Sequence, residues 1–200
     1  MAPMYDPLTR RRLLALGLAA PALWKLADLL GTDSALAATL ACVDDDEPTM
    51  AETEGPYFKR SSPLRRSLRT AGMAGTPLTI TGRVLTTRCT PVKHALLDFW
   101  QADSKGAYDN SGFRLRGHQF SDALGRYRLD TVVPGLYPGR TRHLHVKAQA
   151  PRKPVLTTQL FFPGEAQNAS DSIYDASLLV RRWRKVGARR VATFDFILDV

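Results

Sequence analysis

Apolar and polar residues alternate with a period of two along much of the chain after residue 77. The alternation covers residues 78–84, 127–129 and 194–200, and short apolar runs cover residues 96–100 and 160–162. A period of two places every second side chain on the same face of a β-strand. The pattern therefore predicts several short strands, most of them with one buried face.

Clusters of turn-forming residues separate these segments. They lie at residues 103–106, 122–125, 134–135 and 138–139. Many short strands joined by Gly, Pro and Asp turns are typical of a β-sandwich. We predict an all-β fold for residues 78–200, a β-sandwich of mostly antiparallel short strands, with one helical turn within residues 171–180. Residues 38–77 would form an irregular N-terminal arm that wraps the sandwich.

The first 37 residues have the organisation of an export signal. Three arginines at residues 10–12 precede an apolar stretch over residues 13–24, and residues 35–37 offer an A-x-A cleavage site. The apolar stretch is too short to span a bilayer, which needs about 20 residues. The paired arginines fit a twin-arginine signal, and an ordinary secretory signal is the alternative. We expect a periplasmic or extracellular protein without a transmembrane segment in its mature form.

The chain has two cysteines, Cys42 and Cys89. An oxidising compartment permits them to pair, and this disulfide would tie the arm to the body of the domain. The alternative is that Cys42 becomes a lipid-modified N-terminus, although residues 39–42 match that pattern poorly. We expect the disulfide, with the two sulfurs serving structure rather than chemistry.

The net charge of the chain says little about which class of molecule it binds. The 200 residues suffice for one domain with a core, and the formal charge is +9. The first 37 residues hold four bases and three acids, so their removal changes this charge little. Positive charge attracts anionic substrates or surfaces, but it also describes a solvated basic face. No recognised nucleic-acid motif accompanies the basic run at residues 181–185, so we expect no nucleic-acid partner.

The most specific local feature is the sequence His143-Leu144-His145. Residues two apart on a strand share a face, so both imidazoles would point one way, and Leu144 and Val146 the other. Imidazole binds several transition metals, so the pair can form half of a metal site, although two surface histidines are the commoner explanation of such a pair taken alone. No carboxylate lies nearby and neither cysteine has zinc-ligand spacing, which argues against the common zinc and iron(II) sites.

Tyrosines are the other candidate ligands. Tyr108 follows a turn that ends at Gly106-Ala107, and Tyr137 lies between two Pro-Gly pairs. Phenolate is a hard, anionic oxygen ligand, so two phenolates with two imidazoles would favour iron(III) over iron(II) or zinc. Each tyrosine also fits a core position. For Tyr57 and Tyr127 we favour a core or pocket-wall position.

An ordered series of short motifs runs through the middle of the chain. It comprises residues 53–57, 97–103, 106–108, 116–119, 122–127, 134–140, 143–145 and 158–162. This series resembles the intradiol ring-cleavage dioxygenase family, the catechol and protocatechuate dioxygenases, and particularly its smaller exported branch. The resemblance covers roughly residues 42–165.

The resemblance implies an iron enzyme. It predicts that non-haem Fe(III) is held by two tyrosines and two histidines, namely Tyr108, Tyr137, His143 and His145. It further implies that a small aromatic diol and molecular oxygen are the partners. The catechol-type ring would open between its two hydroxylated carbons and give a muconate-type diacid. A homo-oligomer is compatible with this prediction.

The resemblance also assigns roles around the metal. It predicts Arg140 and Gln159 as catalytic residues that stabilise negative charge developing on the substrate. The diol would bind through both oxygens and displace Tyr137 and a hydroxide, which take up its two protons.

Three positions depart from the family's pattern. Only five residues separate Tyr137 from His143, where catechol and protocatechuate enzymes have a longer segment. Arg142 stands where proline is more usual, and His118 where tyrosine is common. We expect a shallower, more open pocket that admits bulky or polymer-linked catechols, with Arg142 adding positive charge at its mouth.

A binding module without catalysis is the alternative. Residues 82–84, 90–92 and 122–127 also resemble transthyretin-like and peptidase-associated β-sandwiches. That interpretation explains the strands, the turns and Tyr127. It does not explain why the candidate ligands, Arg140 and Gln159 occur together in the order of the family.

Overall fold

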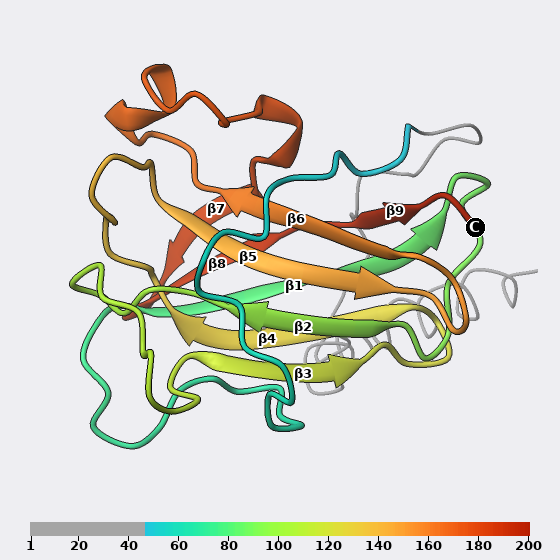
Figure 1. Cartoon of the computed structure of the whole chain (residues 1–200), viewed down its shortest axis with the longest axis horizontal. Coiled ribbons are helices and arrows are strands. Elements are labelled where there is room, and N and C mark those ends of the chain that lie inside the picture. Colours follow the sequence, from blue (N-terminus) through green and yellow to red (C-terminus); the bar gives the residue numbers. More distant parts are fainter. Residues whose placement is uncertain (1–46) are drawn as a thin grey trace, which may run out of the picture. The chain divides into compact units, whose positions relative to one another are not determined.

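Two β-sheets pack face to face in the computed structural model, which describes residues 47–200 (Figure 1). The five-stranded sheet has the order β4-β1-β8-β7, with β9 also paired to β1. Its strands are β1 (Pro77–Thr86), β4 (Arg126–Val132), β7 (Arg181–Val186), β8 (Arg189–Thr193) and β9 (Phe196–Leu198). The four-stranded sheet has the order β3-β2-β5-β6. Its strands are β2 (Leu96–Trp100), β3 (Arg116–Phe120), β5 (His143–Gln149) and β6 (Val155–Phe161).

The prediction of an all-β sandwich is confirmed. Neighbouring strands run antiparallel except where β1 pairs with β8 and with β9. Two 3₁₀ helices, η3 (Ala166–Ala169) and η4 (Ala176–Leu178), follow β6. The second lies within the predicted helical turn, whereas the first precedes it.

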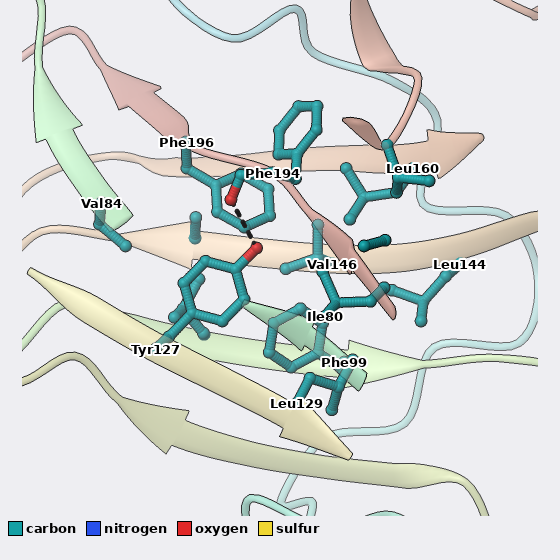
Figure 2. Close-up of a cluster of buried hydrophobic side chains, with 14 of the residues drawn as sticks. Ile80, Val84, Phe99, Tyr127, Leu129, Leu144, Val146, Leu160, Phe194 and Phe196 are labelled. Carbon is teal, nitrogen blue, oxygen red and sulfur yellow. Dashed lines mark hydrogen bonds between the residues drawn. The ribbon is translucent and has the colours of Figure 1, made fainter. Parts of the chain in front are cut away.

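The core lies between the two sheets and is built by the alternation seen in the sequence (Figure 2). Ile80 and Leu129 from one sheet and Val146 from the other are fully buried. Tyr127 is a core residue, and its hydroxyl donates a 2.8 Å hydrogen bond to the carbonyl of Phe194. Burial of these apolar faces is the main force that holds the sheets together.

The C-terminal strands differ from the sequence prediction. The pattern at residues 194–200 suggested one strand, but β9 covers only Phe196–Leu198 and Val200 is exposed. The hairpin of β7 and β8 was not predicted. Every residue of β7 except Trp183 is exposed, so this edge strand lacks the alternation that a buried face would impose.

The arm preceding β1 crosses the outer face of the four-stranded sheet (Figure 1). At one edge the Glu52 amide donates to the Thr157 carbonyl of β6 at 2.8 Å. At the other edge the Arg65 amide donates to the His118 carbonyl of β3, also at 2.8 Å. The arm therefore covers both edges of this sheet and closes over the surface between them.

Several predictions fall on residues 1–46, which lie outside the described part of the chain. They include the export signal over residues 1–37 and the Cys42 half of the proposed disulfide. Cys89 itself is disulfide-bonded. Within residues 47–200, no helix is long and apolar enough to cross a membrane.

Candidate metal centre

The outer face of β5 presents His143 and His145 side by side. Both side chains are almost fully buried, and their rings lie 4.9 Å apart with planes at 86°. The intervening Leu144 points into the core, as does Val146. This is the arrangement that the two-residue period predicts for a strand.

Neighbouring strands place further side chains beside His145. Trp100 of β2 lies directly across from His145 in the sheet, and the two rings stack at 4.9 Å with planes 7° apart. Gln159 lies opposite His145 on β6. Above this row the arm approaches so closely that a Cβ on Gly55 would lie 3.4 Å from the Cε1 atom of His145. The imidazole is thus held between the sheet and the arm.

One loop brings Tyr108 to the histidines, and a second brings Tyr137 to Tyr108. The Tyr108 hydroxyl lies 3.1 Å from Nε2 of His143, and its ring lies 6.1 Å from that of His145. The ring of Tyr137 lies 5.8 Å from that of Tyr108. The structure therefore brings all four predicted ligands together, although they come from separate parts of the chain.

The two loops are joined through their glycines. Gly106 has a φ of +87°, and a Cβ there would lie 2.1 Å from the carbonyl oxygen of Leu136. The amide of Gly135 donates to the Asp103 carbonyl at 2.7 Å. Only glycine permits this contact at position 106, so the turn that precedes Tyr108 also fixes the position of Tyr137.

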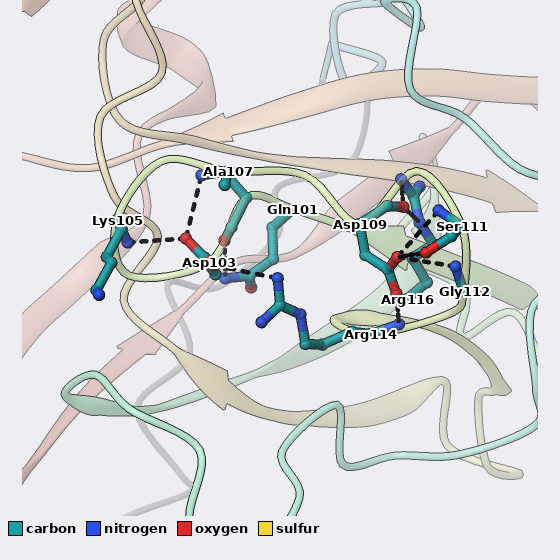
Figure 3. A network of polar contacts seen from close by, with 10 residues as sticks. Gln101, Asp103, Lys105, Ala107, Asp109, Ser111, Gly112, Arg114 and Arg116 are labelled. Atoms are coloured by element: carbon teal, nitrogen blue, oxygen red, sulfur yellow. Dashed lines mark hydrogen bonds and ion pairs between the residues drawn. The ribbon is translucent and has the colours of Figure 1, made fainter.

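Aspartates on both sides of Tyr108 hold its loop in shape (Figure 3). Asp103 accepts hydrogen bonds from the amides of Lys105 and Ala107 at 2.9 and 3.1 Å. Asp109 accepts from the amide of Gly112 at 2.8 Å. The backbone donors at Gly112 and Arg114 hold the pKa of Asp109 well below its usual range.

Arg116 is a fully buried cation beneath this loop. Its guanidinium donates to the carbonyl of Asp109 at 2.9 Å and to that of Tyr57 at 2.5 Å. It therefore ties the Tyr108 loop to the arm. The sequence motif at residues 116–119 gave no sign of this role.

Tyr57 of the arm is a wall of the site. Its ring stacks on that of Tyr108 at 4.4 Å, and its hydroxyl lies 2.8 Å from that of Tyr137. This hydrogen bond raises the pKa of Tyr57 above its usual value, and burial of the hydroxyl raises it further. Sequence alone left Tyr57 between a core and a wall position because its place depends on the path of the arm.

Arg140 and Gln159 lie next to each other at the site. The guanidinium of Arg140 donates to Oε1 of Gln159 at 2.9 Å and to Oδ2 of Asp171 at 2.8 Å. The amide of Gln159 in turn donates to the carbonyl of Thr53 in the arm at 2.9 Å. Asp171 also accepts the backbone amide of Thr141 at 2.8 Å. Sequence reasoning missed Asp171, which lies 31 residues after Arg140.

Burial keeps the two imidazoles uncharged. It lowers the pKa of His143 to about 4, although the carbonyl of Thr141 opposes this effect. Burial likewise lowers the pKa of His145 far below its usual value, and the neighbouring His143 and Arg140 lower it further. Since Nδ1 of His143 donates to Thr141 at 2.7 Å, its Nε2 lone pair faces Tyr108.

These residues fit a metal ion that accepts nitrogen and oxygen ligands. Nδ1 of His145 is buried without a hydrogen-bond partner within residues 47–200. Burial raises the pKa of Tyr108, which a bound cation would reverse by favouring the phenolate. No three His, Cys, Asp or Glu side chains cluster within that part of the chain, so a centre here requires the phenol oxygens. Phenolates with neutral imidazoles suit a hard trivalent cation.

A hollow of about 310 Å³ borders the cluster. It is lined by the segment from Leu136 to Thr141 and by Gln167, Ser170 and Asp171. Arg142 does not line it, and its guanidinium pairs with Glu165 at 2.7 Å. The prediction of added positive charge at the mouth is therefore wrong, because a carboxylate already neutralises Arg142.

Comparison with known families gives a match over most of the chain. A family model described as Dioxygenase matches residues 53–200. Among curated proteins, the protocatechuate 3,4-dioxygenase beta chain of Burkholderia cepacia is 32% identical over 121 residues, which are 52% of either chain. The hydroxyquinol 1,2-dioxygenase of Rhodococcus opacus is 31% identical over 74% of this chain and 58% of its own length. The chain thus spans about half the length of the curated relatives it matches.

Solved structures include a more similar chain. This chain is 58% identical to the dioxygenase domain of a dioxygenase and carbohydrate-binding protein fusion from the cellulolytic bacterium Streptomyces sp. SirexAA-E. The match has a TM-score of 0.75 and covers 77% of this chain and 99% of that domain. The 3-chlorocatechol 1,2-dioxygenase of Rhodococcus opacus 1CP is 26% identical, with a TM-score of 0.68 over 76% of this chain and 72% of its own.

Proposed function

Because the chain belongs to the intradiol ring-cleavage dioxygenase family, we propose that it is a non-haem iron(III) enzyme that opens catechol-type rings. The bond between the two hydroxylated carbons breaks, and both atoms of molecular oxygen enter the product. Each of those carbons becomes a carboxylate, so one catechol and one oxygen give one muconate-type dianion and two protons.

One observation carries this proposal. Two phenols and two uncharged imidazoles converge at one place on the outer face of the four-stranded sheet. The iron would be held by Tyr108, Tyr137, His143 and His145. When bound there, it would draw electron density from the chelated diol and prepare the ring for oxygen.

The residues around the proposed metal would accept a proton, stabilise negative charge and exclude water. Tyr137 is half-buried and hydrogen-bonded to Tyr57, so its oxygen is placed to accept a proton from the incoming diol. Arg140 is a permanent cation that stabilises negative charge on the substrate, and Gln159 orients it through their 2.9 Å hydrogen bond. Trp100 and the arm exclude water from His145.

A binding module without catalysis accounts for the sandwich but not for this cluster. Burying imidazoles and phenols costs free energy unless each polar atom is paired, and Nδ1 of His145 has no partner within residues 47–200. A module gains nothing from that arrangement, whereas a metal centre requires polar groups held without competing partners.

The visible spectrum of the iron-loaded protein tests the proposal. Iron(III)–tyrosinate absorbs visible light, so we expect a red protein whose band moves to longer wavelength when catechol is added without oxygen. Tyr137→Phe should shift or bleach the band and sharply reduce turnover. Tyr127→Phe is the control, since Tyr127 lies in the core between the sheets and its hydroxyl donates to the carbonyl of Phe194. A protein that stays colourless after iron reconstitution contradicts the proposal and favours the binding module.

We also propose that the protein is exported to the periplasm or beyond. The arginines at residues 10–12, the apolar stretch after them and the A-x-A site support this. Fractionation of cells that express the full chain, with N-terminal sequencing of the product, tests it. A cytoplasmic protein that keeps residues 1–37 would contradict it.

A further inference from the structure

The hollow beside the cluster carries no net charge, although the chain carries +9. Among residues 47–200, Arg140 and Asp171 are the only charged residues that line it. They form an ion pair at 2.8 Å, and the Asp171 side chain is almost completely buried. Because the one cation already faces a carboxylate, a second anion entering the hollow would find little attraction.

Three other cations near the site already have partners. Arg142 pairs with Glu165, and Lys147 pairs with Glu54 of the arm. Arg116 is fully buried, and its guanidinium donates to the backbone carbonyls of Asp109 and Tyr57. None of these three lines the hollow.

Much of the positive charge lies on the other sheet. The β7–β8 hairpin carries a dense group of cations: Arg181, Arg182, Arg184, Lys185, Arg189 and Arg190. These strands belong to the five-stranded sheet, whereas the cluster lies on the outer face of the four-stranded sheet. None of these cations lines the hollow, and exposed charges are screened over about 8 Å at physiological salt.

We propose that the enzyme prefers catechols with uncharged ring substituents over carboxylated ones such as protocatechuate. This inference rests on the proposed function and names its substrate class. A ring held at the cluster borders the hollow at Tyr137 and Arg140. An uncharged substituent there packs against Leu136 and Pro138, whereas a carboxylate gives up water and approaches Asp171.

Steady-state kinetics with three diols test this preference. We expect kcat/KM for catechol and 4-methylcatechol to exceed that for protocatechuate at least about tenfold, which corresponds to one lost charged contact. Equal values, or a preference for protocatechuate, would overturn the inference.

A charge added to the hollow provides a second test. Leu136 is partly exposed and lines the hollow, so Leu136→Lys introduces a cation without touching the ion pair. We expect its kcat/KM for protocatechuate relative to 4-methylcatechol to rise by about threefold to tenfold at low salt, and the gain to shrink as salt is added. Leu136→Gln is the uncharged control, because it removes the same apolar contact; its change in the ratio should be smaller than that of Leu136→Lys and should not depend on salt. An equal change in both variants would show that charge in the hollow does not select the substrate.

The two proposals fail in distinguishable ways. A red protein that cleaves catechol but prefers protocatechuate keeps the proposed function and refutes the neutral-substrate inference. A colourless protein that cleaves none of the three diols refutes the proposed function, and the inference with it.

Discussion

The hydroxyl oxygens of Tyr57 and Tyr137 lie 2.8 Å apart, which links the arm to the proposed ligand that an incoming diol would displace. The two residues are 80 positions apart in the chain. Through this contact the arm takes part in the proposed chemistry as well as closing the pocket. A hydrogen bond from Tyr57 would stabilise Tyr137 whenever its oxygen carries negative charge.

Tyr57→Phe should lower kcat several-fold and shift the visible band of the iron-loaded protein. The phenylalanine ring of the variant can still stack on Tyr108, but the hydrogen bond to Tyr137 is lost. Steady-state kinetics and absorption spectra measure both effects. Tyr127→Phe serves again as the control, and an unchanged spectrum for Tyr57→Phe would show that the contact is absent from the iron-bound protein.

Removal of iron with a strong chelator should abolish colour and turnover but leave the sandwich folded. The proposed ligands lie on the outer face of the four-stranded sheet, and the apolar core lies on the opposite face. We expect an unchanged β-type circular dichroism spectrum and a lower Tm, because a ligand that binds only the folded state stabilises it. Loss of the β-signal on chelation would show that the metal is required for folding.

Gly106→Ala should disrupt the site more than the sandwich. A Cβ at this position would overlap the carbonyl of Leu136 and push apart the loops of Tyr108 and Tyr137. We expect iron content and turnover to fall sharply. Gly187→Ala is the control, because its φ is also positive but nothing lies within 4 Å. That variant should lose only about 1 to 2 kcal/mol of stability and keep its iron.

Tyr127→Phe should destabilise the protein without affecting the chemistry. The buried hydroxyl of Tyr127 donates to the carbonyl of Phe194, and its loss leaves that carbonyl unpaired. We expect a loss of about 1 to 3 kcal/mol in the free energy of unfolding. Urea denaturation of the iron-loaded protein measures it. A changed visible spectrum would contradict the assignment of Tyr127 to the core.

Asp130 should contribute stability that disappears in acid. Burial raises the pKa of this carboxyl, but hydrogen bonds from Arg128 and Thr79 outweigh it and lower the pKa overall. A lowered folded-state pKa stabilises the protein above the unfolded-state value of about 4, and the contribution is lost as pH falls through the folded-state value.

The variant Asp130→Asn measures this contribution. The difference in unfolding free energy between the parent and the variant should be largest near neutral pH and should shrink below about pH 4. Comparing the two proteins at each pH cancels effects of iron loss, because both share the same site. A difference that stays constant with pH would show that the charge of Asp130 contributes nothing.

The period of two along the sequence predicted the strands that have one face in the core and the other face outside it. The histidine pair was placed on one face of a strand because the period of two fixes it. The partners of that pair could not be found in this way. Tyr57, Arg116 and Asp171 reach the site through the path of the arm and through loops, which no local pattern encodes. Tyr108 and Tyr137 were candidates from the chemistry of their phenols, and the resemblance to a family then selected them over core positions.

The arginines of β7 have a second consequence, because β7 lies at the edge of its sheet. β7 is the last strand in the order β4-β1-β8-β7, and a bulge shifts its register between Arg181 and Arg184. The backbone of such a strand can pair with another molecule and start aggregation. Like charges and a local twist both oppose that pairing, since two copies would have to bring their arginines together. We therefore expect these arginines to oppose edge-to-edge association of the protein.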